Sequence, residues 1–140
     1  MRYVGLDLGE KTIGVAISDA LLISAQPLTV IKRSQIRTDL STLKELIEPY
    51  SPVEIVLGLP LNMNGTEGPR AQATREFGHI LQEEGYKVHF WDERLSTMAV
   101  EKVMIKADLS RRKRKQVIDQ QAAAYILQGF IDRINLTRGN

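Results

Sequence analysis

Three strand-like segments follow one another within the first 32 residues, and the connections between them are short. Arg2–Leu8 and Thr12–Ser18 flank a turn at residues 9–11, and residues 28–31 (LTVI) are rich in the β-branched side chains that strands favour. A crossover between parallel strands needs a dozen or more residues, so these segments predict antiparallel hairpins. We therefore expect the chain to open with an antiparallel meander.

From Thr38 onward the apolar residues recur at helical spacing. Helical and strand-like segments then alternate, which predicts an α/β fold with a mixed central sheet. No linker, repeat or low-complexity tract interrupts the pattern, so we expect a single domain, residues 1–140. The elements expected after the meander are a helix from residue 38 to about 49, a strand at 54–58, a helix at 69–85, a strand at 88–91, a helix opening at 95–97 and a helix from about 115 to 133.

The residue types that the chain lacks narrow the kinds of site it can build. Of its 140 residues none is Cys and 2 are His, which excludes a disulfide framework, a thiolate metal site and a histidine-rich metal cluster. No run of about 18 apolar residues occurs, and the first residues lack the apolar stretch of a signal peptide. We therefore expect a cytoplasmic protein that does not enter a membrane.

Basic residues are concentrated near the end of the chain. Residues 1–100 hold 10 Lys or Arg against 13 Asp or Glu, whereas residues 101–140 hold 9 against 4. Most of the excess is one run of adjacent cations, Arg111, Arg112, Lys113, Arg114 and Lys115. The run fits a phosphate-binding patch, because backbone charge dominates affinity for nucleic acid. It equally fits a solvated loop or helix start, and the run alone does not separate the two.

Two carboxylates, Asp7 and Glu93, lie inside a predicted strand and directly after another. Asp7 lies inside a predicted strand, on the face opposite Leu6 and Leu8, and the glycines at positions 5 and 9 let backbone or ligand approach closely. Glu93 follows a predicted buried strand at its carboxyl end, where α/β sheets bind their ligands. The alternatives are an Asp that starts a turn and a Glu in a surface ion pair.

A third carboxylate, Asp119, lies on the apolar face of the last predicted helix. At about 100° per residue, Ile126 and Phe130 fall within roughly 20° of Asp119 around the helix axis, whereas Gln128 and Asp132 fall on the opposite side. An unpaired charge on such a face is very costly. Asp119 must therefore be paired with an arginine, protonated, or coordinating a cation.

Asp7, Glu93 and Asp119 together fit a metal site built from oxygen ligands alone. Such sites suit hard cations such as Mg²⁺ or Mn²⁺. Two ions about 4 Å apart can activate a water and stabilise the leaving oxygen in phosphodiester cleavage. If the three acids form this site, their carboxyl groups should lie within roughly 4–8 Å of one another.

Four segments, spread in order over nearly the whole chain, resemble the motifs of a known family. They are residues 5–19 (GLDLGEKTIGVAISD), 58–66 (GLPLNMNGT), 92–97 (DERLST) and 119–128 (DQQAAAYILQ). The family they resemble is YqgF, whose bacterial members are described as Holliday junction resolvases (RuvX) and as nucleases of the pre-16S ribosomal RNA.

The resemblance implies a ribonuclease H-like fold, with a mixed five-stranded sheet and helices on both faces. It also implies that Asp7, Glu93 and Asp119 are the catalytic, metal-binding acids. In the mechanism we favour, Asp7 bridges two ions and the other two acids each complete one side. The implied reaction is hydrolysis of a phosphodiester with Mg²⁺ or Mn²⁺ as cofactor.

Contacts to nucleic acid are expected from one loop and from cations around the acids. The polar loop at 62–68, which we expect to be flexible, would lie against the nucleic-acid backbone through Asn62 and Asn64. Basic side chains would neutralise phosphates without reading sequence; these are Lys11, Arg94, Arg111, Arg112, Lys113 and Arg114.

The function we favour is processing of the 5′ end of the ribosomal RNA precursor, because it fits a small protein without an evident partner domain. The first alternative is resolution of Holliday junctions in branched DNA. Two others are a nucleotide-binding module similar to the sugar kinases and actin, and a non-catalytic RNA-binding factor. We expect a monomer or a weak homodimer.

Overall fold

The computed structural model describes residues 1–94 and 111–138, with side chains placed at 1–94 and 121–138. The helix expected to open at residues 95–97 lies outside this part of the chain. Within it, no helix is both long enough and apolar enough to cross a membrane.

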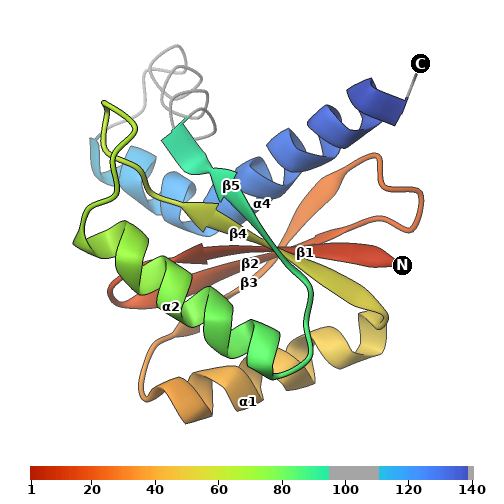
Figure 1. The fold of residues 1–140 in the computed structure, drawn as a ribbon, viewed down its shortest axis with the longest axis horizontal. Helices are drawn as coiled ribbons and strands as arrows, with labels where there is room; N and C mark the ends of the chain where they lie inside the picture. Colours follow the sequence, from red (N-terminus) through yellow and green to blue (C-terminus); the bar gives the residue numbers. More distant parts are fainter. Residues whose placement is uncertain (95–110, 139–140) are drawn as a thin grey trace.

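One five-stranded sheet forms the centre of the molecule, with the strand order β3-β2-β1-β4-β5 (Figure 1). The first three strands form the expected antiparallel meander, whereas β4 pairs parallel to β1 and β5 pairs parallel to β4. The mixed five-stranded sheet is therefore confirmed. The strands are β1 (Arg2–Leu8), β2 (Thr12–Ser18), β3 (Ala25–Lys32), β4 (Val53–Leu59) and β5 (Val88–Asp92).

Helices cover both faces of the sheet, as Figure 1 shows. One face is covered by α1 (Ile36–Ile47), which continues into a short 3₁₀ turn (Glu48–Tyr50), and by α2 (Pro69–Glu83). The other face is covered by α4 (Arg111–Arg138). Each face buries its own apolar cluster, one built on Val4, Leu6 and Leu8 of β1, the other on Tyr3 of the same strand.

The alternation of side chains along β1 decides which face receives Asp7. Leu6 and Leu8 are buried against α1 and α2, so Asp7 faces α4, as the sequence predicted. The same rule puts Tyr3 and Gly5 on the α4 face, where the Tyr3 ring packs edge-on against Phe130 with 5.1 Å between centroids.

Two elements are longer than the sequence indicated. The strand expected at 28–31 begins at Ala25, because residues 25–27 pair with the end of β2 in spite of Pro27. The last helix begins at Arg111 rather than near Lys115 and continues to Arg138. Lys and Arg are good helix formers, so the basic run enters the helix instead of preceding it. At the other end, Asn135 anchors the helix by donating a 2.9 Å hydrogen bond to the Leu22 carbonyl.

Helix α4 lies unusually close to the sheet over two glycines. A Cβ on Gly5 would lie 2.7 Å from Leu127 Cβ and 2.8 Å from the Ala123 carbonyl oxygen. A Cβ on Gly58 would lie 2.5 Å from Ile126 Cδ1. The absence of a side chain at both positions therefore sets how near α4 can come.

We expect Gly5→Ala to destabilise the protein by about 1–3 kcal/mol, because the added methyl group has no room beneath α4. This exceeds the stabilisation of up to about 1 kcal/mol that Gly→Ala brings through the unfolded chain. Urea unfolding measures the change. Ser41→Ala, on the exposed side of α1, is the control and should stay within about 0.5 kcal/mol. Equal stability of Gly5→Ala and the parent protein would contradict the close approach.

Candidate active site

Asp7 occupies a row of the sheet from which neighbouring side chains are missing. It is the second-last residue of β1, and its partner in β2 is Gly14. On its other side, the position after the Leu6–Leu57 pair brings Gly58 of β4 beside it. Residues paired directly across a sheet point to the same face, so two glycines flank the Asp7 carboxylate on the α4 side. Neither neighbour of Asp7 in this row places a side chain of its own beside the carboxylate.

Glu93 approaches Asp7 across this row. It follows directly after Asp92, the last residue of β5, at the carboxyl end of the strand, as predicted. Its Oε2 atom lies 3.0 Å from the place where a Cβ of Gly58 would be. The carboxylate therefore lies beside Gly58, near enough to Asp7 for the two charges to interact. The structure brings together two of the three acids that the sequence singled out.

The electrostatics of Glu93 reflect this closeness. Burial first, and then the negative charge of Asp7, raise the pKa of Glu93 from 4.5 to about 7. The charge of Arg70 acts in the opposite direction, and that of Asp92 adds to the rise. Two carboxylates that share a half-buried site without full compensation repel each other, and a cation between them would relieve the repulsion.

Asp119 lies in α4, and its side chain is outside the described residues. The packing of the helix nonetheless indicates which turn passes over Asp7. Phe130 packs on Tyr3, and Leu127 and Ala123 pack on Gly5. Two residues along a strand advance about 6.6 Å and four along a helix about 6 Å. The two residues from Gly5 to Asp7 along β1 therefore correspond to about four residues along α4. That distance leads to the helical turn before Ala123, which contains Asp119.

No metal cluster can be assigned from the described side chains alone. Among them, no group of three or more His, Cys, Asp or Glu residues is arranged to hold a metal ion. Asp7 and Glu93 are two of the three predicted ligands, and the assignment of all three stays a proposal.

Arg94 clamps the loop after β4 to the end of β5. Its Nε and Nη2 atoms donate to the two carboxylate oxygens of Asp92, at 3.0 and 2.6 Å. Its Nη1 donates to the carbonyl oxygens of Asn62 and Met63, at 3.3 and 3.1 Å. The guanidinium also holds the pKa of Asp92 below its usual range. Arg94 thus has a structural role that the sequence did not indicate, and its predicted contact with phosphate stays a prediction.

The loop that we expected to be flexible forms a hydrogen-bonded turn, and its flexibility stays a prediction. The Asn62 amide donates to the Thr66 carbonyl and the Gly65 amide to the Asn62 carbonyl, both at 2.8 Å. The Asn64 side chain accepts from the Thr66 hydroxyl at 2.6 Å. Gly65 has a φ of +86°, a conformation that favours glycine. The side-chain amides of Asn62 and Asn64 therefore shape the turn, and residues 62–66 are exposed.

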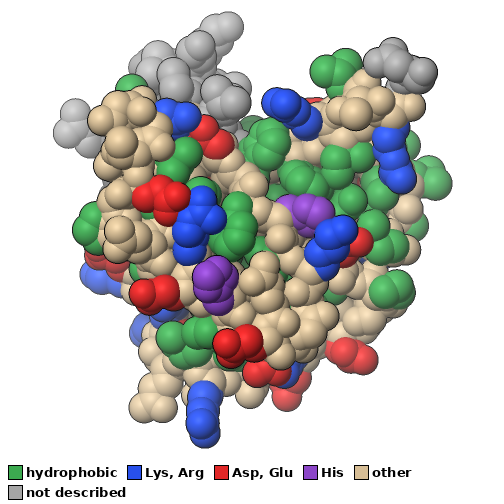
Figure 2. All heavy atoms as spheres, in the orientation of Figure 1, with side chains coloured by type: hydrophobic (Ala, Val, Ile, Leu, Met, Phe, Trp, Pro, Cys, Tyr) green, Lys and Arg blue, Asp and Glu red, His purple; other side chains and the backbone are tan. Residues whose placement is uncertain are grey.

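The other predicted nucleic-acid contacts lie at two places in the fold. Lys11 is exposed in the turn between β1 and β2, beyond the Asp7 end of β1. The cations Arg111, Arg112, Lys113 and Arg114 lie in the first turns of α4, and their side chains are outside the described residues. On the face drawn in Figure 2, basic and acidic side chains are interspersed rather than gathered by sign.

Arg70, which the sequence did not single out, also borders the site. It follows Pro69 in the first turn of α2 and is close enough to Glu93 for its charge to lower the pKa of that carboxyl. The signal that could have identified it is its position at the start of the helix that follows β4, because ligands bind at this edge of α/β sheets.

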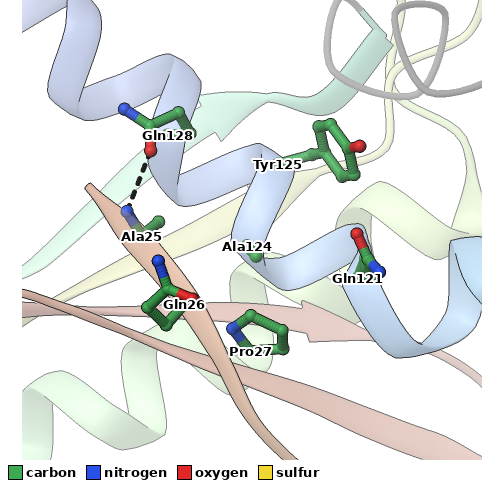
Figure 3. A pocket seen from close by; sticks show the side chains of 7 residues that line it. All are labelled: Ala25, Gln26, Pro27, Gln121, Ala124, Tyr125 and Gln128. Carbon is green, nitrogen blue, oxygen red and sulfur yellow. Dashed lines mark hydrogen bonds between the residues drawn. The ribbon is translucent and has the colours of Figure 1, made fainter. Parts of the chain in front are cut away.

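A separate pocket lies between the edge strand β3 and α4 (Figure 3). The Gln128 side chain accepts a hydrogen bond from the Ala25 amide at 2.8 Å and donates one to the Ile23 carbonyl at 3.0 Å. It thereby fastens the strand to the helix. The pocket has a volume of about 390 Å³, and its lining carries no charged side chain: Ala25, Gln26, Pro27, Gln121, Ala124, Tyr125 and Gln128. It is distinct from the acidic site.

Comparison with known proteins identifies close relatives. Residues 1–133 match the family model described as "RuvX: Holliday junction resolvase". A protein of Moorella thermoacetica named "Putative pre-16S rRNA nuclease" is 58% identical over 135 residues, covering 96% of both chains. One of Desulfitobacterium hafniense with the same name is 56% identical over 140 residues, covering 99% of this chain and 97% of its own.

Solved structures share the fold at low sequence identity. RuvC of T. thermophilus, in complex with a Holliday junction substrate, aligns with a TM-score of 0.55 and 16% identity over 96% of both chains. The Holliday junction resolvase of fowlpox virus aligns with a TM-score of 0.54 and 15% identity, over 95% of this chain and 99% of its own. The expected ribonuclease H-like fold is confirmed.

The raised pKa of Glu93 makes stability depend on pH in a defined direction. The folded protein keeps the Glu93 proton up to about pH 7, whereas the unfolded chain releases it near 4.5. The stabilisation of the folded protein by protonated Glu93 is complete below about pH 4.5. It is lost as the pH rises through about 7, the pKa in the folded protein. In chelator, we expect Glu93→Gln to be more stable than the parent by about 2 kcal/mol at about pH 8, with little difference at about pH 4.

Thermal melts over this pH range measure the effect. Glu83→Gln, an exposed position on α2, controls for the loss of a carboxylate and should show no such trend. A difference between Glu93→Gln and the parent that does not change with pH would contradict the electrostatic account.

Proposed function

The chain belongs to the RuvX (YqgF) family, and from this premise we propose that it is a metal-dependent nuclease that processes the 5′ end of the pre-16S ribosomal RNA. The relatives that are 56–58% identical carry the corresponding name. The proposal includes a cytoplasmic location, where the ribosomal RNA precursor would be met.

The observation that carries the proposal is the pair Asp7 and Glu93. The two carboxylates lie near each other at the carboxyl edge of the sheet, where burial first and then the charge of Asp7 raise the pKa of Glu93. Oxygen ligands that carry negative charge suit Mg²⁺ or Mn²⁺.

We propose that Asp7, Glu93 and Asp119 would together hold two such ions. The turn of α4 that contains Asp119 corresponds to Asp7 in the packing register, which supports the third ligand. When bound, the ions would supply an activated water and stabilise the charge that develops on the phosphate. The protein's own contribution is to hold the three carboxylates at rigid elements of the sheet and helix.

The nucleic acid would lie along the carboxyl edge of the sheet. The clamped turn at 62–66 presents exposed polar groups there, and Lys11 lies at the same edge. Lys11 and the cations at the start of α4 would bind phosphates and so position the backbone without reading its sequence. We propose a monomer or weak homodimer as the working form.

Resolution of Holliday junctions is the second candidate. The description of the family model favours it, and so does the fold shared with RuvC and the fowlpox resolvase. Fold likeness alone says little about substrate, so identical assays on both substrates have to decide. A non-catalytic RNA-binding factor and a nucleotide-binding module would show no metal-dependent cleavage of either one.

We expect the purified protein to cleave a pre-16S RNA fragment containing the 5′ processing site, with Mg²⁺ or Mn²⁺ and not in chelator. Asp7→Asn, Glu93→Gln and Asp119→Asn should each reduce the rate by at least about 100-fold, because each removes a proposed metal ligand. Asp7→Asn should leave folding intact or slightly strengthened, since it removes a repulsion. Asp132→Asn, on the exposed side of α4, should cleave normally.

The outcomes separate the candidate functions. Cleavage of a four-way DNA junction with no cleavage of the RNA would establish the resolvase alternative. Metal-independent binding of RNA without cleavage would leave the non-catalytic factor. A large loss of stability in Asp7→Asn would indicate a structural carboxylate and contradict the assignment of the site.

The basic run at the start of α4 allows a second test. Changing Arg112, Lys113 and Arg114 to Gln should flatten the salt dependence of nucleic-acid affinity, by roughly 0.7–0.9 in log–log slope per lost phosphate contact. The loss should be about equal for different sequences, because phosphate contacts position but do not specify. The rate of cleavage at saturating substrate should stay close to that of the parent protein.

A triple variant elsewhere provides the matched control. Lys87, Arg133 and Arg138 are exposed, and changing all three to Gln removes the same charge. An unchanged slope in the first variant, or equal slopes in both, would show that the basic run is only a solvated part of the helix.

A further inference from the structure

A small hollow opens at the end of β1, directly after Asp7. Two of its lining residues are arginines, and the others come from the end of β1, the turn that follows and the first two turns of α2. The lining consists of Leu8, Gly9, Glu10, Arg33, Arg70, Ala73 and Thr74. The hollow therefore lies on the side of the acids opposite to α4.

The arginines of this region differ in what binds their guanidinium groups. Arg33 donates to the Gly9 carbonyl at 2.7 Å and lies 4.0 Å from Asp39. Arg75 is paired with Glu67 at 2.6 Å, and Arg94 is held by Asp92 and the turn carbonyls. Within the part of the chain that the structure describes, the Arg70 guanidinium has neither a hydrogen bond nor an ion pair.

Arg70 combines an anchored backbone with an exposed side chain. Its carbonyl accepts a 2.9 Å hydrogen bond from the Thr74 hydroxyl, and the neighbouring Ala71 and Thr74 side chains are fully buried against the sheet. The residue itself is exposed. Helix α2 thus fixes the backbone of Arg70, while the exposed guanidinium can bind a ligand.

The charge of Arg70 is felt at the acidic site, since it opposes the rise in the pKa of Glu93. An arginine serving only to neutralise Glu93 would be expected to form the bidentate pair that Arg and carboxylates favour. No such pair is present, so the guanidinium stays available while lying close to the acids.

We propose that Arg70 binds a phosphate of the nucleic-acid backbone next to the bond that is cleaved. This inference rests on the proposed nuclease function and adds a substrate-binding residue on the α2 side of the acids. A planar guanidinium can hold two phosphate oxygens at once. Substrate would then be gripped between Arg70 on one side and α4 with its basic run on the other.

Binding and cleavage of the pre-16S RNA fragment test the proposal with separate readouts. Binding is measured in chelator in a Glu93→Gln background, which stops cleavage and removes any effect transmitted through Glu93. There, Arg70→Gln should lower the salt slope by roughly 0.7–0.9, whereas Arg133→Gln, a matched loss of an exposed cation on α4, should not. With Glu93 intact and metal present, kcat/KM should fall roughly 10- to 100-fold in Arg70→Gln.

Arg70→Lys distinguishes a phosphate contact from general electrostatics. It should restore most of the salt slope but only part of kcat/KM, because a lysine cannot bind two oxygens in one plane. Equal behaviour of Arg70→Gln and Arg133→Gln, with the parent protein cleaving normally, would overturn this inference alone. If the parent protein neither binds nor cleaves RNA or junction DNA, the proposed function fails instead. Thermal melts confirm that each variant is folded.

Discussion

The repulsion between Asp7 and Glu93 is the constraint around which this edge of the molecule is organised. Burial first, and then the negative charge of Asp7, raise the pKa of Glu93 to about 7. Nothing in the packing of a small α/β protein requires such a pair. Its presence means that the fold carries an electrostatic cost that a cation would relieve.

The sheet makes this arrangement possible by keeping neighbouring side chains away. Glycines flank Asp7 across the sheet, and Gly5 and Gly58 let α4 pack directly on the strands. The helix therefore passes over the acidic row at close range. On the opposite face, the larger apolar cluster under α1 and α2 holds the same strands in register. A rigid scaffold of this kind is what a metal-binding constellation needs, since the ligands must stay in place without the ion.

Prediction from the sequence succeeded where local pattern and burial agree. Alternation placed Asp7 opposite Leu6 and Leu8, and the carboxyl end of a buried strand placed Glu93 at the ligand-binding edge. It failed where long-range contacts decide. Pro27 belongs to a strand because residues 25–27 pair with β2, and Arg94 holds the turn at 62–66 to the end of β5. The start of the last helix, at Arg111 rather than near Lys115, was missed for the local reason that Lys and Arg favour helices. Arg70 was missed because its position at the start of the helix after β4 was not weighed, and its closeness to Glu93 shows only in the tertiary structure.

The sequence by itself determined the order of the elements, the mixed sheet, the face that carries Asp7 and the family to which the chain belongs. These follow from periodicity, connection length and motifs, all of which are local properties. Only the tertiary structure decided which groups meet: Glu93 beside Gly58, Arg94 between Asp92 and the turn, and Arg70 near Glu93 with no ion pair to any described residue. The reason is physical. Charge interactions and close approach depend on distances in space between residues that are far apart along the chain.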